Sequence, residues 1–223
     1  MTRTLHTDPV SGRELANEMD LNFMMGAVGS DCSAMGNQIQ LSAEDLARLS
    51  PSPLIKQLGA QIVADAKGKP ILDVACGGGR NAVLLAHLGG NVIGIDNDLK
   101  RLEAERVRLA DTIFAPAFSK IKPFSLDLLA DEWPFQPGSI GGIVNVHFLC
   151  SALFPAFASS IVPGGCLLLE TIQGRGGNYL QLPKAKTLQS AFENFFALNL
   201  YKERKAGPKN HDAVTVQMFG TRL

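Results

Sequence analysis

The spacing of apolar positions changes at Pro53, and this change divides the chain into two parts. Residues 1–52 mix polar residues with Gly, Met and Ser, and only residues 43–49 have a helical pattern. Ser42 is the expected cap of that short helix, because Asp45 follows it three residues later. We interpret residues 1–52 as an N-terminal arm or lid and residues 53–223 as one folded domain.

From Pro53 onward, short apolar runs alternate with helical patterns. Leu54, Leu58 and Ile62 share one helical face, and Gly68 ends that helix. Further helices are expected at residues 81–88, 99–111, 150–160 and 187–196, and strands at residues 71–75, 91–95, 124–127, 140–147 and 166–172. Residues 163–165 (Pro-Gly-Gly) are expected to form a turn between the last two of these strands. The alternation predicts an α/β fold with a parallel sheet covered by helices.

The end of the chain follows a different rule. Residues 198–203 and 213–219 are two strand-like runs, and their short connection leaves no room for a crossover helix. They are therefore expected to pair as an antiparallel hairpin. Pro123 cannot donate a hydrogen bond to a sheet, so the third strand should lie at an edge or begin after it.

Composition excludes several classes of protein. The chain of 223 residues is 46% hydrophobic, carries 21 basic and 21 acidic residues, and has four scattered cysteines. This balance argues against disorder, against a nucleic-acid surface and against a zinc or disulfide framework. No apolar run is long enough for a membrane helix and no signal peptide is evident, so we expect a cytoplasmic protein with no membrane partner.

A glycine-rich turn carries the strongest chemical signal. Residues 71–81 read Ile-Leu-Asp-Val-Ala-Cys-Gly-Gly-Gly-Arg-Asn, a strand that runs through glycines into a helix. Backbone N–H groups and the helix N-terminus converge there on a place for an anionic ligand group. Gly77, Gly79 and Ala82 also satisfy the spacing of a nicotinamide or flavin site, so the turn alone is ambiguous.

Two acids narrow the choice of ligand. Asp73 lies just before the turn, where a carboxylate would repel a pyrophosphate and attract an ammonium group. Asp96 closes the second strand 23 residues later, where a carboxylate can accept both ribose hydroxyls. The alternative is that Asp73 only caps the turn and that Asp96 only precedes the next helix.

These residues resemble the class I S-adenosylmethionine (SAM)-dependent methyltransferases. Residues 73–79 are similar to their first motif, D-x-G-x-G-x-G, with Ala75 in place of the first glycine, which weakens the case for a left-handed backbone there. Asp96 resembles the acid of the second motif, residues 125–128 resemble the third, and residues 163–165 resemble the turn before the fifth strand. Gly79-Arg80-Asn81 is most similar to the tellurite-resistance and small thiol methyltransferase branch.

The resemblance implies a fold, a cofactor and a set of site residues. The fold is a Rossmann-like, doubly wound, mostly parallel sheet of seven strands in the order 3-2-1-4-5-7-6, with the last strand antiparallel. The cofactor is SAM, and no metal is expected. The implied cofactor contacts are Asp73, Ala75, Cys76, Gly77, Gly79, Asn81, Asp96, Asn97, Asp127 and Leu128. Cys76 is otherwise interpreted as a small filler of the turn.

The acceptor side is less defined. His147 ends the fourth strand and is the candidate catalytic base, with a core histidine as the alternative. Arg80 is either a substrate contact or a solvated residue. Residues 173–179 form either a substrate-closing loop, through Arg175, Asn178 and Tyr179, or an ordinary surface loop.

The sequence therefore predicts methyl transfer from SAM to a small nucleophilic acceptor. A thiolate or an oxyanion needs no base, whereas an oxygen or nitrogen acceptor would require one. The alternatives are a nicotinamide-dependent oxidoreductase and a SAM-binding protein without catalysis. An apolar cluster at Leu21, Phe23, Met24 and Met25 should either cover the cofactor from above or brace the helix at residues 54–62. The sequence does not define the oligomeric state.

Overall fold

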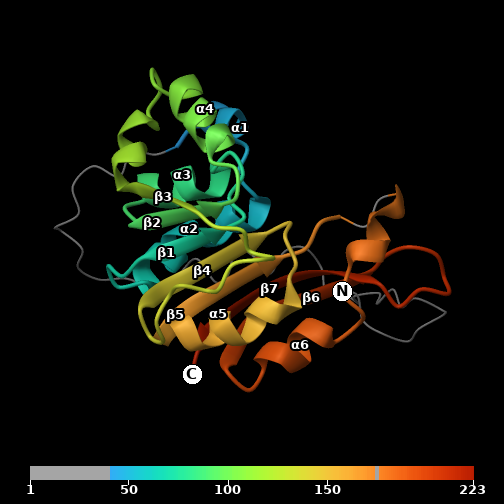
Figure 1. Ribbon diagram of the computed structural model, residues 1–223. Helices are drawn as coiled ribbons and strands as arrows, with labels where there is room; N and C mark the ends of the chain where they lie inside the picture. Colours follow the sequence, from blue (N-terminus) through green and yellow to red (C-terminus); the bar gives the residue numbers. More distant parts are fainter. Residues whose placement is uncertain (1–40, 174–175) are drawn as a thin grey trace, which may run out of the picture. The chain divides into compact units, whose positions relative to one another are not determined.

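One seven-stranded sheet organises the part of the chain that the computed structural model describes, residues 41–173 and 176–223 (Figure 1). The strands are β1 (Ile71–Val74), β2 (Val92–Asp96), β3 (Ile121–Ser125), β4 (Ile140–Val146), β5 (Ile161–Glu170), β6 (Phe196–Lys205) and β7 (Val214–Arg222). Their order is β3-β2-β1-β4-β5-β7-β6. The first five strands are parallel, and β7 runs antiparallel to both β5 and β6. The predicted fold class, strand order and closing hairpin are confirmed.

Helices cover both faces of this sheet, and each face has its own apolar core. They are α1 (Ala43–Leu49), α2 (Pro53–Asp65), α3 (Arg80–His87), α4 (Lys100–Arg108), α5 (Phe154–Ser160) and α6 (Thr187–Phe192), with short 3-10 turns η2 (Ala115–Lys120), η3 (Ser151–Leu153) and η4 (Gly176–Gln181). One core lies between the sheet and the first four helices, α1, α2, α3 and α4. The other core lies between the opposite face of the sheet and helices α5 and α6 (Figure 1). Because both faces are covered, β1 and β4 are buried along their whole length, and each is apolar except for one polar residue, Asp73 in β1 and Asn145 in β4.

Local signals explain where the first helices begin. The Ser42 hydroxyl accepts a hydrogen bond from the Asp45 N–H, and the Asp45 carboxylate accepts one from the Ser42 N–H. This reciprocal pair confirms the predicted cap. Ser52 caps α2 in a similar way, and Pro53 occupies the first helical position, where its missing N–H costs nothing.

Residues 163–165 correct one expectation. They lie inside β5 rather than in a turn, and form a bulge: Ile140 pairs with Ile161 and Gly142 with Cys166, so residues 162–165 face one residue of β4. Gly164 has φ +79°, and a Cβ on Gly165 would lie 2.5 Å from the Gly141 carbonyl oxygen. The glycines permit the detour and the close approach, so the ladder continues past them.

Pro123 lies within β3, which begins at Ile121, earlier than expected. The sequence allowed two arrangements, a third strand at the edge of the sheet or one that begins after Pro123. The structure has the first, because β3 is an edge strand that pairs only with β2. A missing N–H at the edge removes no central ladder bond.

Residues 41–52 pack on the domain instead of standing apart from it. Leu49 belongs to the same apolar core as α2 and α3, and Leu41 and Leu46 pack against that core. The apolar cluster at Leu21 to Met25 lies outside the described residues, and the arm or lid expected for residues 1–52 stays a prediction. Within the described part of the chain, every helix is too short or too polar to cross a lipid bilayer.

Candidate active site

The glycine-rich turn between β1 and α3 has a left-handed backbone at alternate positions. Ala75, Gly77 and Gly79 have φ values of +57°, +56° and +74°. The expectation that an alanine at position 75 disfavours a left-handed backbone there is therefore wrong. A non-glycine residue with this φ is strained, and the surrounding turn maintains it.

Asp96 joins the turn to the end of β2. Its Oδ2 accepts a hydrogen bond from the Gly77 N–H at 2.8 Å, and its Oδ1 accepts one from the Asp98 N–H at 3.1 Å. The side chain is half-buried, and each carboxylate oxygen keeps a second lone pair. Asp96 therefore holds the turn in place and can still accept hydrogen bonds from a ligand. Asn97 lies beside it and is exposed.

Asp73 and Asn81 hold the turn from the inside. Asp73 is 1% exposed, and its Oδ2 accepts the Ala82 N–H in the first turn of α3 at 3.0 Å. Burial raises the pKa of Asp73 to about 7, although the Ala82 N–H and Arg80 oppose the shift. The buried Asn81 accepts the Ser52 N–H through its Oδ1 at 2.9 Å. Asp73 thus has the capping role that was its alternative interpretation, and cofactor contacts by Asp73 and Asn81 stay predictions.

Packing explains two further residues of the turn. Burial raises the pKa of the Cys76 thiol well above its usual range, which agrees with a filler and not with a reactive thiolate. A Cβ on Gly79 would lie 2.4 Å from Leu102 Cδ1, so glycine lets α4 approach the turn. A Cβ on Gly77 would meet the Arg101 guanidinium at 3.5 Å. Arg101 is therefore a cation beside the turn that the sequence analysis did not select.

The end of β3 contributes an exposed acid. Asp127 Oδ1 accepts the Leu129 N–H at 2.9 Å, and the Asp127 N–H donates to Asp131 at 2.8 Å. Leu128 is buried. The Leu126 N–H donates to the Asp96 carbonyl oxygen at 3.1 Å, which ties this segment to the end of β2. The ends of β1, β2 and β3 therefore form one continuous edge, as the sequence predicts.

His147 follows β4 in a left-handed conformation, with φ +67°. Its backbone N–H donates to the Glu170 carbonyl oxygen at 2.7 Å, and its ring Nδ1 lies 3.5 Å from an Arg80 guanidinium nitrogen. A guanidinium can only donate, so this contact assigns Nδ1 as the acceptor and the ring proton to Nε2. Desolvation and Arg80 lower the pKa of His147, against the opposing charge of Glu170.

Two polar residues at this edge, Glu170 and Asn145, were not among the site residues predicted from the sequence. The Glu170 carboxylate ends β5 and binds the Ser52 hydroxyl through Oε2, and its Oε1 accepts the Gln217 amide at 3.0 Å. An acid that closes an apolar run, the signal that identified Asp96, could also have identified Glu170. Asn145 lies beside Val74 in the sheet and is fully buried, and its amide has no hydrogen-bond partner among the described residues. One polar residue in an otherwise apolar strand was its signal.

Two adjoining hollows open beside His147 and Glu170, and Thr171 and Ile172 line both. The first, of about 230 Å³, is also lined by His147, Phe148, Leu149, Gln181 and Leu182. The second, of about 410 Å³, extends along the β6–β7 hairpin. The carboxyl edge of the sheet therefore carries the glycine-rich turn at the end of β1 and, beside the ends of β4 and β5, two hollows large enough for a small acceptor molecule.

Only part of the candidate substrate loop, residues 173–179, is seen to lie near these hollows. Asn178 is exposed, and Arg175 lies outside the described residues. The Tyr179 ring packs edge-on against His211 with centroids 4.8 Å apart, and it fills the space above Gly207. Tyr179 thus lies against the β6–β7 connection. Arg80, in contrast, lies at the site through His147 and also donates to the Ser50 carbonyl oxygen at 3.3 Å.

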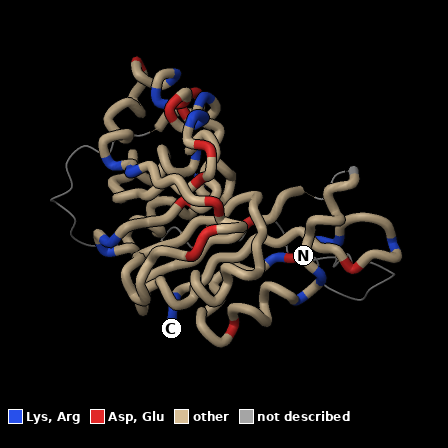
Figure 2. The backbone as a smooth tube through the Cα atoms, in the orientation of Figure 1, with Lys and Arg blue, Asp and Glu red and all other residues tan. Residues whose placement is uncertain are grey.

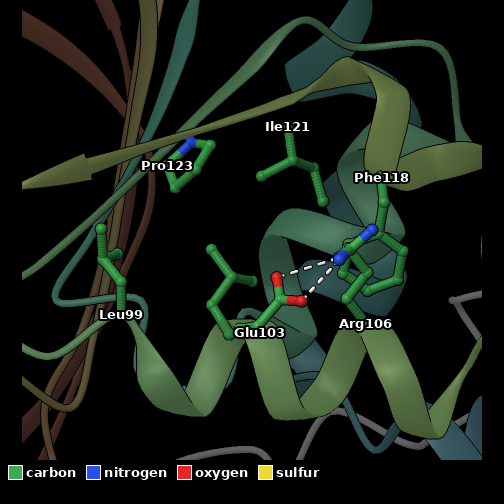
Figure 3. Close-up of a pocket in the computed structure, with 7 residues that line it drawn as sticks. Leu99, Glu103, Arg106, Phe118, Ile121 and Pro123 are labelled. Atoms are coloured by element: carbon green, nitrogen blue, oxygen red, sulfur yellow. Dashed lines mark hydrogen bonds and ion pairs between the residues drawn. The ribbon is translucent and has the colours of Figure 1, made fainter.

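A separate hollow of about 170 Å³ lies between α4 and β3 (Figure 3). Leu99, Phe118, Ile121 and Pro123 make it apolar, and an ion pair between Glu103 and Arg106 stands beside it. No residue predicted from the sequence as a site residue lines this hollow. We therefore do not assign it to the reaction.

Known proteins share these features. A family model described as a methyltransferase domain matches residues 72–161. An uncharacterised methyltransferase of Synechocystis sp. is 27% identical over 152 residues, 65% of this chain and 66% of that protein. A ubiquinone biosynthesis O-methyltransferase of Dechloromonas aromatica is 32% identical over 118 residues, 51% of this chain and 48% of that protein. The chain thus spans about half to two thirds of the length of these relatives.

Solved structures share the fold. TehB from Haemophilus influenzae superposes with a TM-score of 0.57 at 14% identity, covering 81% of this chain and 66% of that one. A TehB-like SAM-dependent methyltransferase from Corynebacterium glutamicum gives 0.51 at 19% identity, covering 81% of this chain and 94% of that one. At these identities the likeness concerns the fold alone. Residues 72–161 therefore match a methyltransferase domain, and the chain resembles the class I SAM-dependent methyltransferases in its strand order and in the glycine-rich turn joined to Asp96.

Proposed function

We propose that the protein binds SAM over the ends of β1, β2 and β3 and transfers its methyl group to a small acceptor held beside β4 and β5. The hydrogen bond from the Gly77 N–H to Asp96 carries this proposal. It joins the glycine-rich turn to the candidate ribose-binding acid, so one unit presents both to a ligand.

The residues present fit a SAM molecule. Asp96 has free lone pairs for ribose hydroxyls, and Gly77 keeps the turn open. Asp127 is exposed at the end of β3, where the resemblance implies an adenine contact. The unpartnered amide of Asn145 beside β1 is the kind of buried polar group that a ligand satisfies.

SAM, when bound, supplies a methyl group activated by a sulfonium centre. The protein's part is then to align the acceptor and exclude water, which can lower a barrier by about 7–11 kcal/mol. The described residues suit this role, because Phe148 and Leu149 give the first hollow an apolar side beside the polar His147, Thr171 and Gln181.

An oxygen acceptor is supported by the relatives named as O-methyltransferases, and a thiol or an oxyanion is the other option carried from the sequence. His147 was the expected base. Burial, and to a smaller extent the charge of Arg80, lower the pKa of His147, and Nδ1 is engaged by Arg80, so we assign His147 to holding the acceptor through Nε2–H. Most of the rate enhancement of methyl transfer then comes from alignment of the acceptor with the methyl group.

The test is titration calorimetry with SAM and with its demethylated product, S-adenosylhomocysteine. Asp96→Ala removes hydrogen bonds to a charged acceptor, worth ~1.5–3 kcal/mol each, and should weaken binding at least about tenfold. Asp98→Ala removes a neighbouring exposed carboxylate outside the turn and serves as the matched control. Equal affinities in wild type and Asp96→Ala would refute the assignment.

An acceptor screen follows the titration. Phenols, thiols and oxyanions of selenium and tellurium cover the acceptor classes above. Methylation of any of them supports the proposal. Tight SAM binding with no turnover across the panel would instead identify a SAM-binding protein without catalysis.

A further inference from the structure

The second hollow has an uneven charge distribution that bears on the acceptor. Glu170, Gln217 and Lys202 lie side by side across β5, β7 and β6, because Gln217 pairs in register with both of the others. Arg204 pairs with Thr215 two residues further out, and therefore projects from the same face as Lys202. Residues that pair in register project from the same face of a sheet, so Lys202 and Arg204 line the hollow together.

The acid in this hollow is already engaged. Both Glu170 oxygens have partners, the Ser52 hydroxyl and the Gln217 amide, at the end of the hollow nearest β4. The only acid within the basic run of β6, Glu203, belongs to the other face. Its carboxylate accepts the Lys186 N–H at 2.7 Å and binds the Tyr201 hydroxyl.

The cations have no such partners. In the described ranges, neither Lys202 nor Arg204 forms an ion pair, and both side chains are exposed. Lys205 also lines the hollow. Figure 2 shows basic positions along the outer part of the β6–β7 hairpin. The outer end of the hollow is therefore cationic, whereas the end near β4 carries an engaged carboxylate.

We propose that the methyl acceptor is a small molecule with an anionic group, a carboxylate or a phosphoryl group, that Lys202 and Arg204 bind. Because the two hollows share Thr171 and Ile172, an acceptor anchored there can extend its nucleophilic atom toward His147. Arg and Lys bind such groups through charge-assisted hydrogen bonds. Hollows of about 230 and 410 Å³ suit a small ligand rather than a polymer. This inference rests on the proposed function.

The experiment measures anion binding directly, without turnover. Inorganic pyrophosphate and tricarballylate, probes of the phosphoryl and carboxylate options, are titrated calorimetrically at fixed ionic strength. The wild type is compared with the double variant Lys202→Gln/Arg204→Gln and with Lys120→Gln/Lys122→Gln, which removes two exposed charges at the β3 end of the sheet. We expect one probe to bind the wild type, the first variant to bind it at least tenfold more weakly, and the control to match the wild type.

Each result decides the inference separately from the proposed function. S-adenosylhomocysteine is titrated into the same three proteins and should bind all of them equally. If it does not bind the wild type, the proposed function fails while the anion data still stand. Absence of probe binding to the wild type, or an equal loss in both double variants, overturns the inference. A 20-nucleotide RNA that binds the wild type more tightly than both probes and is lost in Lys202→Gln/Arg204→Gln overturns it in favour of nucleic acid.

Discussion

The two halves of the sheet's carboxyl edge are built in different ways. At the ends of β1 to β3, backbone conformation and short-range bonds shape the site: the left-handed turn, the Gly77 N–H on Asp96, and the Ala82 N–H on Asp73. At the ends of β4, β5 and β6 and the beginning of β7, side chains from distant segments shape it. Glu170, for example, binds Ser52, 118 residues away, and Gln217, 47 residues away.

This difference separates a fixed ligand from a variable one. A site made of backbone groups and few side chains accommodates one cofactor shape and tolerates little change. A site made of side chains on a hairpin can change its charge without disturbing the sheet, as the exposed Lys202 and Arg204 illustrate. The comparison predicts that substitutions in the first half act through conformation, and substitutions in the second through contacts.

The largest effect is expected from Gly77→Val. A β-branched residue at φ +56° is strained by roughly 1–3 kcal/mol, so the turn should leave the conformation that brings the Gly77 N–H to Asp96. Binding of S-adenosylhomocysteine, measured by calorimetry, should fall by about a hundredfold.

Gly68→Val is the matched control for this substitution. Gly68 also has a left-handed backbone, with φ +78°, but it lies before β1 and a Cβ there would meet open space. The control should lose stability and keep its affinity. Equal loss of affinity in both variants would mean that strain, and not the turn's geometry, accounts for the result.

An intermediate effect is expected from Asp73→Asn. Burial raises the pKa of Asp73 from 3.8 to about 7, so between about pH 4 and pH 7 the folded state holds a proton that the unfolded state has released. Wild-type stability should therefore fall as pH rises through this window and then level off. Asparagine stays neutral and keeps an oxygen for the Ala82 N–H, so the variant should be more stable at pH 8 by up to about 4 kcal/mol.

Denaturant unfolding from pH 4 to pH 8 measures this difference, and a ligand titration completes the test. If Asp73 also attracts the ammonium group of SAM, the stabilised variant should bind the cofactor more weakly. A variant no more stable than wild type at pH 8 would contradict the burial argument. Greater stability with unchanged affinity would leave Asp73 with its capping role alone.

The same comparison explains how much the sequence could predict. The glycine turn and Asp96 were predictable from residue types close in sequence, whereas the strand order followed from the family resemblance, since β1 pairs with β4 and β5 with β7 across long stretches of chain. The bulge at residues 163–165 was not, since only pairing with β4 shows that the strand resumes after the glycines. Ala75 misled because the turn imposes a conformation that its residue type disfavours. Glu170 and Lys202 needed the register of β5, β7 and β6 before their places in one hollow were visible.

The smallest effect is expected at the boundary of the two halves, from His147→Asn. Asparagine tolerates the left-handed backbone at this position and retains an N–H donor for the acceptor. If His147 holds the acceptor and Arg80 opposes protonation of its ring, kcat should fall less than about tenfold while the acceptor KM rises. A general base would instead contribute about 10²–10⁴-fold to kcat, and its activity would fall as pH drops through a pKa below 6.5.

Steady-state kinetics from pH 5 to pH 8 distinguish these roles, with His87→Asn on α3 as the control for loss of a histidine away from the strand ends. A thousandfold loss of kcat, together with loss of the fall in activity at low pH, would show that His147 is the base. The residue between the two halves of the edge would then act in proton transfer and not in acceptor binding.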